Sequence, residues 1–303
     1  MRCVNLLLRG WINIKKIVLN EVFYIKEILT NRNTTVSVCD MPYVLGTAGK
    51  YLYQREKLKP KQIKEKLYEL ASRLVSGGGD NYKELIDKIA SGDNKKVPIN
   101  EIDYIAITES EIKTVKKLSS TSERKIAFTL LCLAKYRNAY IDGNSNWETY
   151  EFIDIFNMAN SKVSAADRGK IINKLVIGGY IKPSKKITNC NYQVLFVDDD
   201  SQEVLKITDF RDLGYTLLSY LGEEFDRCEI CGRLIRYQKK KNHKKYCSMC
   251  TKKFKYNNSN NLYVPVKQRP IITYCSCCGD KMYINPSMLW LDSICDKCKD
   301  AQN

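Results

Sequence analysis

Apolar residues between positions 60 and 90 recur every three or four residues, which is the spacing of one helix face. Pro60 suits the first turn of the first helix, the glycines at 77–79 end it, and a second helix follows Asp80. The inward positions of the two helices are Ile63, Leu67, Leu70, Ala71 and Leu74, and then Tyr82, Leu85, Ile86 and Ile89. We therefore expect residues 1–118 to form a helical domain, to which the pattern assigns no role.

Helix-start signals recur further along the chain. Thr108 and Glu111 form a capping box, in which each side chain satisfies a free backbone N–H of the first helical turn. The other expected N-caps are Ser122, Asn146, Ser164 and Thr208, for helices that run to about Tyr140, about Ala159, Ile177 and about Leu221. Two segments rich in β-branched and aromatic residues, 180–181 and 192–197, predict a hairpin after the third of these helices, the one that Ser164 caps. The expected fold class is therefore mainly α with small β elements, or α+β.

Three helices followed by a hairpin, with the third helix ending in Gly-Gly-Tyr-Ile, resemble the winged helix-turn-helix superfamily over about residues 119–200. The resemblance implies a recognition helix at 164–177 that enters the major groove of DNA, and a wing at 180–197 that touches the backbone. The implied contacts are Ser164, Arg168, Lys170 and Lys174 on the helix, and Lys182, Lys185 and Lys186 on the wing. Some members of the superfamily bind protein with the same surfaces, and that alternative stays open.

Eight of the thirteen cysteines fall into two sets of four, each made of two Cys-x-x-Cys pairs. The first set is Cys228, Cys231, Cys247 and Cys250, and the second is Cys275, Cys278, Cys295 and Cys298. This spacing is typical of zinc sites with four thiolate ligands, and Gly232 and Gly279 let the backbone turn so that both thiolates of a pair reach one ion. We expect two structural zinc ions, which stabilise segments too small to have an apolar core.

Two ligand choices stay open at these sites. Cys277 competes with Cys275 in the second set, and His243, the only histidine, could replace one thiolate of the first set. Disulfides are disfavoured because the sequence shows no signal peptide, and no apolar segment approaches the roughly 20 residues that cross a bilayer. The sequence therefore predicts a cytoplasmic protein without a membrane partner.

The formal net charge of +16 is concentrated in two segments. Residues 160–190 carry seven basic side chains against one acid, and residues 228–260 carry ten against one. The candidate nucleic-acid contacts in the second segment are Arg233, Arg236, Lys239, Lys240, Lys241, Lys244 and Lys245, with Tyr237 and Tyr246 among them. Basic and aromatic side chains together are typical of nucleic-acid surfaces. Residues 261–303 are nearly neutral, so we expect the second zinc module to serve in packing or in a protein contact.

Signals for catalysis are weak along the whole chain. The glycines at 46 and 49 lack the spacing and the Ser or Thr of a phosphate-binding loop, and a single histidine limits acid–base chemistry. The acidic run at 198–200 has no spaced carboxylate partners that would indicate a nuclease. We therefore expect no enzymatic turnover.

These observations predict a zinc-containing protein that binds duplex DNA and acts as a transcription regulator or replication-initiation factor. Its expected parts are a helical domain at 1–118, a winged helix-turn-helix at 119–200, a linker helix at 201–226, a basic zinc knuckle at 227–260 and a zinc ribbon at 261–303. One alternative is a protein-interaction factor that binds or inhibits a polymerase, replication or defence complex. Another is a binder of single-stranded RNA or DNA.

Overall fold

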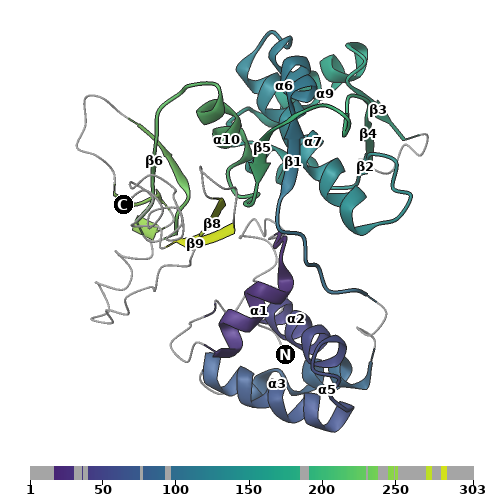
Figure 1. Cartoon of the computed structure of the whole chain (residues 1–303), viewed down its shortest axis with the longest axis vertical. Helices are drawn as coiled ribbons and strands as arrows, with labels where there is room; N and C mark the ends of the chain where they lie inside the picture. The colour runs from purple at the N-terminus through teal and green to yellow at the C-terminus, as the bar shows by residue number, and fades with distance from the viewer. Residues whose placement is uncertain are drawn as a thin grey trace, which may run out of the picture. The chain divides into compact units, whose positions relative to one another are not determined.

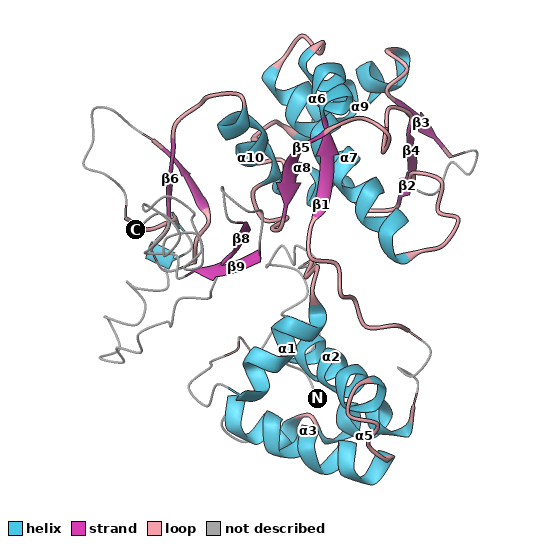
Figure 2. Cartoon of the chain, viewed as in Figure 1, coloured by secondary structure: helices cyan, strands magenta, loops and turns pink. Residues whose placement is uncertain are grey.

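A computed structural model gives the protein's structure. The residues that it describes are 17–30, 36, 40–75, 78–92, 97–184, 191–229, 231–237, 245–248, 250–251, 271–274 and 281–284. These residues form a mainly helical structure with small antiparallel sheets (Figure 2). The chain divides into two compact units, of which one contains Val18–Asp103 and the other contains Tyr104–Lys255.

The N-terminal unit is helical, as the sequence predicts. Its helices are α1 (Glu21–Thr30), α2 (Met41–Gln54), α3 (Pro60–Leu74), the single turn α4 (Gly78–Asn81) and α5 (Lys83–Ser91). The expected inward positions of α3 are all buried, and so are Ile86 and Ile89 of α5. The glycines considered for a phosphate loop lie inside α2. A Cβ at Gly49 would stand 2.2 Å from Cγ2 of Ile89, so glycine permits the close packing of α2 against α5.

The N-terminal unit also contains a buried carboxylate that holds its chain ends together. Glu21 accepts hydrogen bonds from the backbone N–H of Asn100 at 3.0 Å and from the hydroxyl of Tyr43 at 3.1 Å, and Lys50 lies 3.5 Å away. These bonds link the first helix to residues about eighty positions later. The hydrogen bonds of Glu21 therefore fix the start of the unit to its end. The sequence assigns no chemistry to this unit.

The second unit is built around α7 (Thr121–Tyr140), a long helix at its centre (Figure 1). Every residue of α7 from Lys125 to Tyr136 is buried, which is expected of a helix surrounded on all sides. Its partners include α6 (Glu109–Lys116), α10 (Leu213–Tyr220) and β1 (Ile105–Thr108), the strand that pairs with β5 (Glu203–Ile207). The expected capping box of α6 is confirmed, since the backbone N–H of Thr108 donates to Glu111 at 2.8 Å.

The division between the units differs from the boundary expected near residue 118. Strand β1 pairs with β5 in antiparallel register, with Ile105 opposite Ile207, and this pairing draws residues 104–118 into the second unit. The segment 201–226 is likewise not a linker helix, because it contains β5 and then α10, which begins after Asp212 rather than Thr208 and packs on α7. A pairing between residues one hundred positions apart leaves no local sequence signal.

Two more helices and a three-stranded sheet complete the helical part of this unit. They are β2 (Trp147–Glu148), α8 (Phe152–Met158), α9 (Ala165–Ile177), β3 (Ile181–Pro183) and β4 (Tyr192–Val194), and the sheet order is β2-β4-β3. The expected helix from Trp147 is therefore wrong in its first turn. Asn146 takes a left-handed φ of 67° instead of capping a helix, and Trp147 pairs with Gln193 as a strand.

The expected cap of α9 is confirmed, whereas that of α7 is wrong by two residues. The hydroxyl of Ser164 accepts the backbone N–H of Asp167 at 3.2 Å, which confirms the expected start of α9. Helix α7 begins two residues earlier than expected, because Ser120 and not Ser122 accepts the N–H of Glu123, at 3.1 Å. Two short hairpins complete the described chain, β6 (Phe225–Arg227) with β7 (Leu234–Arg236) and β8 (Ile271–Tyr274) with β9 (Lys281–Ile284).

Candidate functional site

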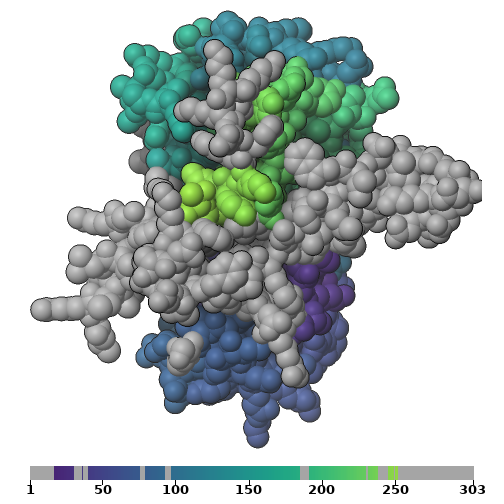
Figure 3. Space-filling view, turned by 90° about the vertical axis from the view of Figure 1, so that its left-hand side faces the viewer, coloured from purple at the N-terminus to yellow at the C-terminus, as the bar shows by residue number. Residues whose placement is uncertain are grey.

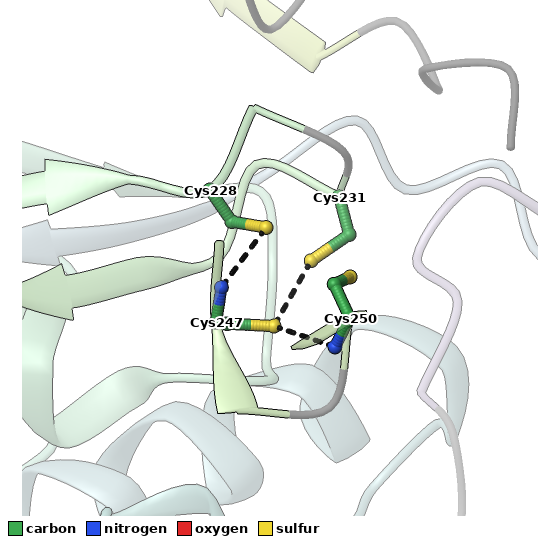
Figure 4. A group of neighbouring side chains, drawn as sticks. All are labelled: Cys228, Cys231, Cys247 and Cys250. Carbon is green, nitrogen blue, oxygen red and sulfur yellow. Dashed lines mark hydrogen bonds between the residues drawn. The ribbon is translucent and has the colours of Figure 1, made fainter. Parts of the chain in front are cut away.

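The four cysteines of the first set converge on one point, as their spacing predicts (Figure 4). Cys228 follows β6 and Cys231 precedes β7, so one pair lies in the turn of the hairpin. Cys247 and Cys250 lie one helical turn apart on a later segment, where the N–H of Thr251 donates to the carbonyl of Cys247 at 2.9 Å. All four sulfur atoms lie within 4.8 Å of one another.

The sulfur positions fit a tetrahedral zinc ion. Zinc–sulfur bonds of about 2.3 Å place the sulfur atoms of a regular tetrahedron about 3.8 Å apart. Sγ of Cys231 lies 3.6 Å from Sγ of Cys247, far beyond the roughly 2.05 Å of a disulfide, and all four cysteines are free thiols. The set can hold one zinc ion with no open coordination position, which is the arrangement of a structural site.

The backbone around the first cysteine pair has a conformation that suits metal binding. Gly232 has a φ of 69°, a conformation that side chains disfavour, and its N–H donates to the carbonyl of Cys228 at 2.8 Å. The N–H of Cys247 donates to Sγ of Cys228 at 3.3 Å, and the N–H of Cys250 donates to Sγ of Cys247 at 3.5 Å. Hydrogen bonds from N–H to sulfur stabilise thiolates, so the turn favours the metal-binding form.

Crowding of the thiols drives their pKa values apart. Hydrogen bonds from Cys231, and then from Cys247 and Cys250, lower the pKa of Cys228 far below its usual value. The bonds to Cys228, Cys231 and Cys247 raise the pKa of Cys250 well above its usual value. The four thiols therefore cannot ionise independently of one another, and a bound cation would compensate the negative charge of the thiolates.

The second cysteine set lies outside the described residues, together with Cys277 and His243. The strands that flank its first pair are nevertheless described. Strand β8 ends one residue before Cys275, and β9 begins two residues after Gly279, just as β6 and β7 flank Cys228 and Gly232. The two cysteine pairs thus share the same position relative to an antiparallel hairpin.

Arg233 joins the four-cysteine module to the helical part of the second unit. Its guanidinium forms hydrogen bonds to Asp212 at 2.8 and 3.0 Å and to the carbonyl of Arg211 at 3.1 Å. Asp212 also accepts from Asn160 at 3.0 Å. The charge of Arg233, an expected nucleic-acid contact, is thus largely compensated within the protein, and this anchoring role has no local sequence signal.

The expected contacts on α9 differ in their surroundings. Lys170 is 74% exposed and Lys174 is 66% exposed, and they lie 2.9 Å from Asp167 and 3.1 Å from Glu123. Arg168 is half-buried, with its guanidinium 5.7 Å from the centre of the Phe156 ring. Ser164 serves as the N-cap. The two lysines are therefore exposed, whereas Arg168 is not.

The remaining expected contacts are described only in part. Lys182 on β3, Arg236 on β7 and Lys245 are exposed. Arg236 lies 2.6 Å from Glu223, in a pair that water screens. Lys185, Lys186, Lys239, Lys240, Lys241 and Lys244 lie outside the described residues.

The acidic run at 198–200 has a structural role. Asp198 accepts hydrogen bonds from the hydroxyls of Ser110 and Ser201, and these bonds lower its pKa to about 2. Asp199 lies 2.9 Å from Lys135, which also pairs with the buried Glu111 at 2.8 Å. Within the described ranges, the four cysteines form the single cluster of side chains suited to a metal ion.

No protein family, curated protein or solved structure matches the chain. In the part of the chain that the structure describes, every helix is too short or too polar to cross a bilayer.

Proposed function

We propose that the chain is a zinc-containing, non-enzymatic protein that binds duplex DNA, as a transcription regulator or a replication-initiation factor. The observation that carries the proposal is the order of elements α7-β2-α8-α9-β3-β4, in which β2 joins the hairpin as a third strand. This is the order of a winged helix, with α9 as recognition helix and β3-β4 as wing. Its first zinc module belongs to the second basic segment of the sequence, residues 228–260.

The exposed charges support this proposal. Lys170 on α9 and Lys182 on β3 are both exposed, and each would neutralise a phosphate. Such contacts position the protein on the duplex, while base edges in the major groove are reached from the first turns of the helix. The pair of Lys170 with Asp167 can open toward phosphate at little cost, since exposed ion pairs contribute only about 0–1 kcal/mol.

The test compares two double variants by fluorescence anisotropy with a random duplex. K170E/K182E is expected to weaken duplex binding at least about tenfold and to lower the salt dependence by about two phosphate contacts. The matched control is K61E/K64E on α3, which changes the charge equally at exposed positions of the other unit. Equal loss in both variants would show that net charge, and not the winged surface, governs binding.

Exposed apolar side chains favour protein binding as a second candidate. Ile177 at the end of α9 is 87% exposed, and Leu195 just after β4 is 50% exposed. If K170E/K182E leaves duplex binding unchanged, these positions become the starting point for a partner surface, and the double variant I177S/L195S is then expected to abolish partner capture.

A further inference from the structure

A cleft of about 650 Å³ lies in the second unit, between the helical part and the four-cysteine module. Its walls come from the loop between α8 and α9, from α10, from β7 and from residues 246–248. Figure 3 shows the side of this unit where the lime-green surface around residue 250 borders the teal and green surfaces. The volume lies in the range of pockets that bind small organic groups.

The cleft is basic and is lined by three aromatic residues. Its charged side chains are Lys125, Lys162, Arg233 and Arg236 against Asp212, and its aromatic residues are Tyr215, Tyr246 and the buried Phe156. Asp212 already pairs with Arg233. Neither Lys125 nor Lys162 forms an ion pair with a carboxylate in the described part of the chain. A ligand with negative charge and flat rings is therefore the complement of these walls.

Lys125 is the deepest of these cations. Its side chain is buried, its ammonium group donates to the backbone carbonyl of Asn160 at 2.5 Å, and it lies 5.4 Å from the centre of the Tyr215 ring. Burial, and then the charge of Arg236, lower its pKa to about 8. An anion in the cleft would further favour the charged form of Lys125.

Polar atoms of the wall also lack partners. The amide nitrogen of Asn157 and the hydroxyl of Ser161 are both buried without a hydrogen-bond partner among the described residues, and both residues line the cleft. Buried polar atoms normally have hydrogen-bond partners, and a buried donor without an acceptor is unfavourable. A bound ligand with acceptor oxygens would satisfy both groups.

The wall is held rigidly. A Cβ at Gly214 would stand 1.8 Å from the carbonyl oxygen of Ala159, so α10 packs directly on the end of α8. Asp212 accepts hydrogen bonds from both Asn160 and Arg233. These bonds connect the helical wall of the cleft to the wall that the four-cysteine module forms. A preformed site of this kind loses little conformational entropy when it binds.

We propose that this cleft binds a segment of single-stranded nucleic acid, with bases against the two tyrosines and phosphates against Lys125, Lys162 and Arg236. A duplex is too wide to enter a cleft of this size, whereas an unpaired strand offers both its rings and its phosphates. The inference rests on the proposed nucleic-acid function but assigns it a second surface, apart from α9 and β3. The protein would thereby favour junctions at which a duplex opens into single strands.

The first test uses the zinc-loaded full chain and three fluorescent probes, namely a blunt duplex, the same duplex with a twelve-nucleotide thymine overhang, and the overhang alone. The overhang is expected to increase affinity at least about tenfold, a gain that stacking of one or two bases can supply. K162E should lose most of this gain and keep blunt-duplex binding. K113E, a matched control at an exposed position on α6, should keep both.

The outcomes separate the two proposals. If the overhang adds nothing, or if K162E weakens both duplexes equally, the cleft proposal is wrong while duplex binding stands. If only the single strand binds, in a manner that depends on Lys162, the cleft proposal stands and the winged-helix proposal fails. Displacement of the strand by thymidine monophosphate or by polyglutamate at equal concentration would also overturn the cleft proposal. The ligand of the cleft would then be a mononucleotide or an acidic protein.

A second test does not depend on the folding of variants. An overhang that carries 5-bromouracil is crosslinked to the protein by ultraviolet light, and the modified peptide is identified by mass spectrometry. Crosslinks to Tyr215 or Tyr246 are the expected result. Crosslinks found solely outside the cleft would overturn the proposal.

Discussion

Glu148 is a carboxyl group whose burial can be detected by titration. Its side chain is buried, Oε2 accepts the backbone N–H of Tyr150 at 2.8 Å, and Oε1 has no hydrogen-bond partner among the described residues. Burial raises the pKa of Glu148 to about 8, although the nearby Arg137 opposes the shift. The folded protein thus binds this proton more tightly than the unfolded chain does, whose Glu pKa is about 4.3.

The sign of the pH dependence follows from linkage. The stabilising contribution of protonated Glu148 is fully present below the unfolded pKa and is lost as the pH rises through about 8. We therefore predict that the unfolding free energy of the wild type, relative to E148Q, falls by roughly 3 kcal/mol between pH 5 and pH 8. Urea unfolding at several pH values measures this difference. The control is E203Q at an exposed position, and parallel curves for E148Q and the wild type would contradict the assignment.

At the scale of elements, α9 carries an unusual residue at its centre. Gly169 lies between Arg168 and Lys170, and a Cβ there would meet no atom within 4 Å. Glycine inside a helix is about 0.5–1 kcal/mol less favourable than alanine, so packing gives no reason for it. We predict that G169A raises the unfolding free energy by about that amount.

The same substitution tests the role of α9 as recognition helix. If a DNA backbone approaches the helix closely at Gly169, G169A should bind duplex more weakly while its unfolding free energy rises. Anisotropy and urea unfolding on one preparation give both values. A gain in unfolding free energy without loss of duplex affinity would show that no DNA backbone approaches the helix closely at Gly169.

Local signals explain which elements the sequence predicts. The capping residues Thr108 and Ser164 lie within three residues of their hydrogen-bond partners, so the starts of α6 and α9 are visible in the sequence. The pairing of β1 with β5 joins residues about one hundred positions apart, and no window of sequence contains both. The first turn expected at Trp147 is wrong for a similar reason, because its partner is Gln193.

At the scale of the whole molecule, metal ligands were more predictable than charge pairs. Four Cys-x-x-Cys pairs restrict the chemistry so strongly that the first cluster follows from spacing alone, and the structure brings its sulfur atoms together. The pairing of Arg233 with Asp212 depends instead on how α10 packs beside β7. A count of basic residues could not show that this charge anchors the zinc module.

Zinc content is a direct test of the cysteine sets. We predict two zinc ions per chain by elemental analysis, and one in C250S, because three thiolates and a serine bind zinc far more weakly than four thiolates. C132A is the matched control, since Cys132 is a buried thiol of α7 whose pKa burial raises and which faces no second cysteine among the described residues. Unchanged zinc content in C250S would contradict the first site.

The measurement that tests the central claim most directly is a salt titration of duplex binding. Zinc-loaded protein is titrated into a fluorescent random duplex at several salt concentrations, and the logarithm of affinity is plotted against the logarithm of salt concentration. The account predicts measurable binding at low salt and a linear fall, with a slope of roughly 0.9 per phosphate contact. No binding to duplex DNA even at low salt would contradict the proposed function.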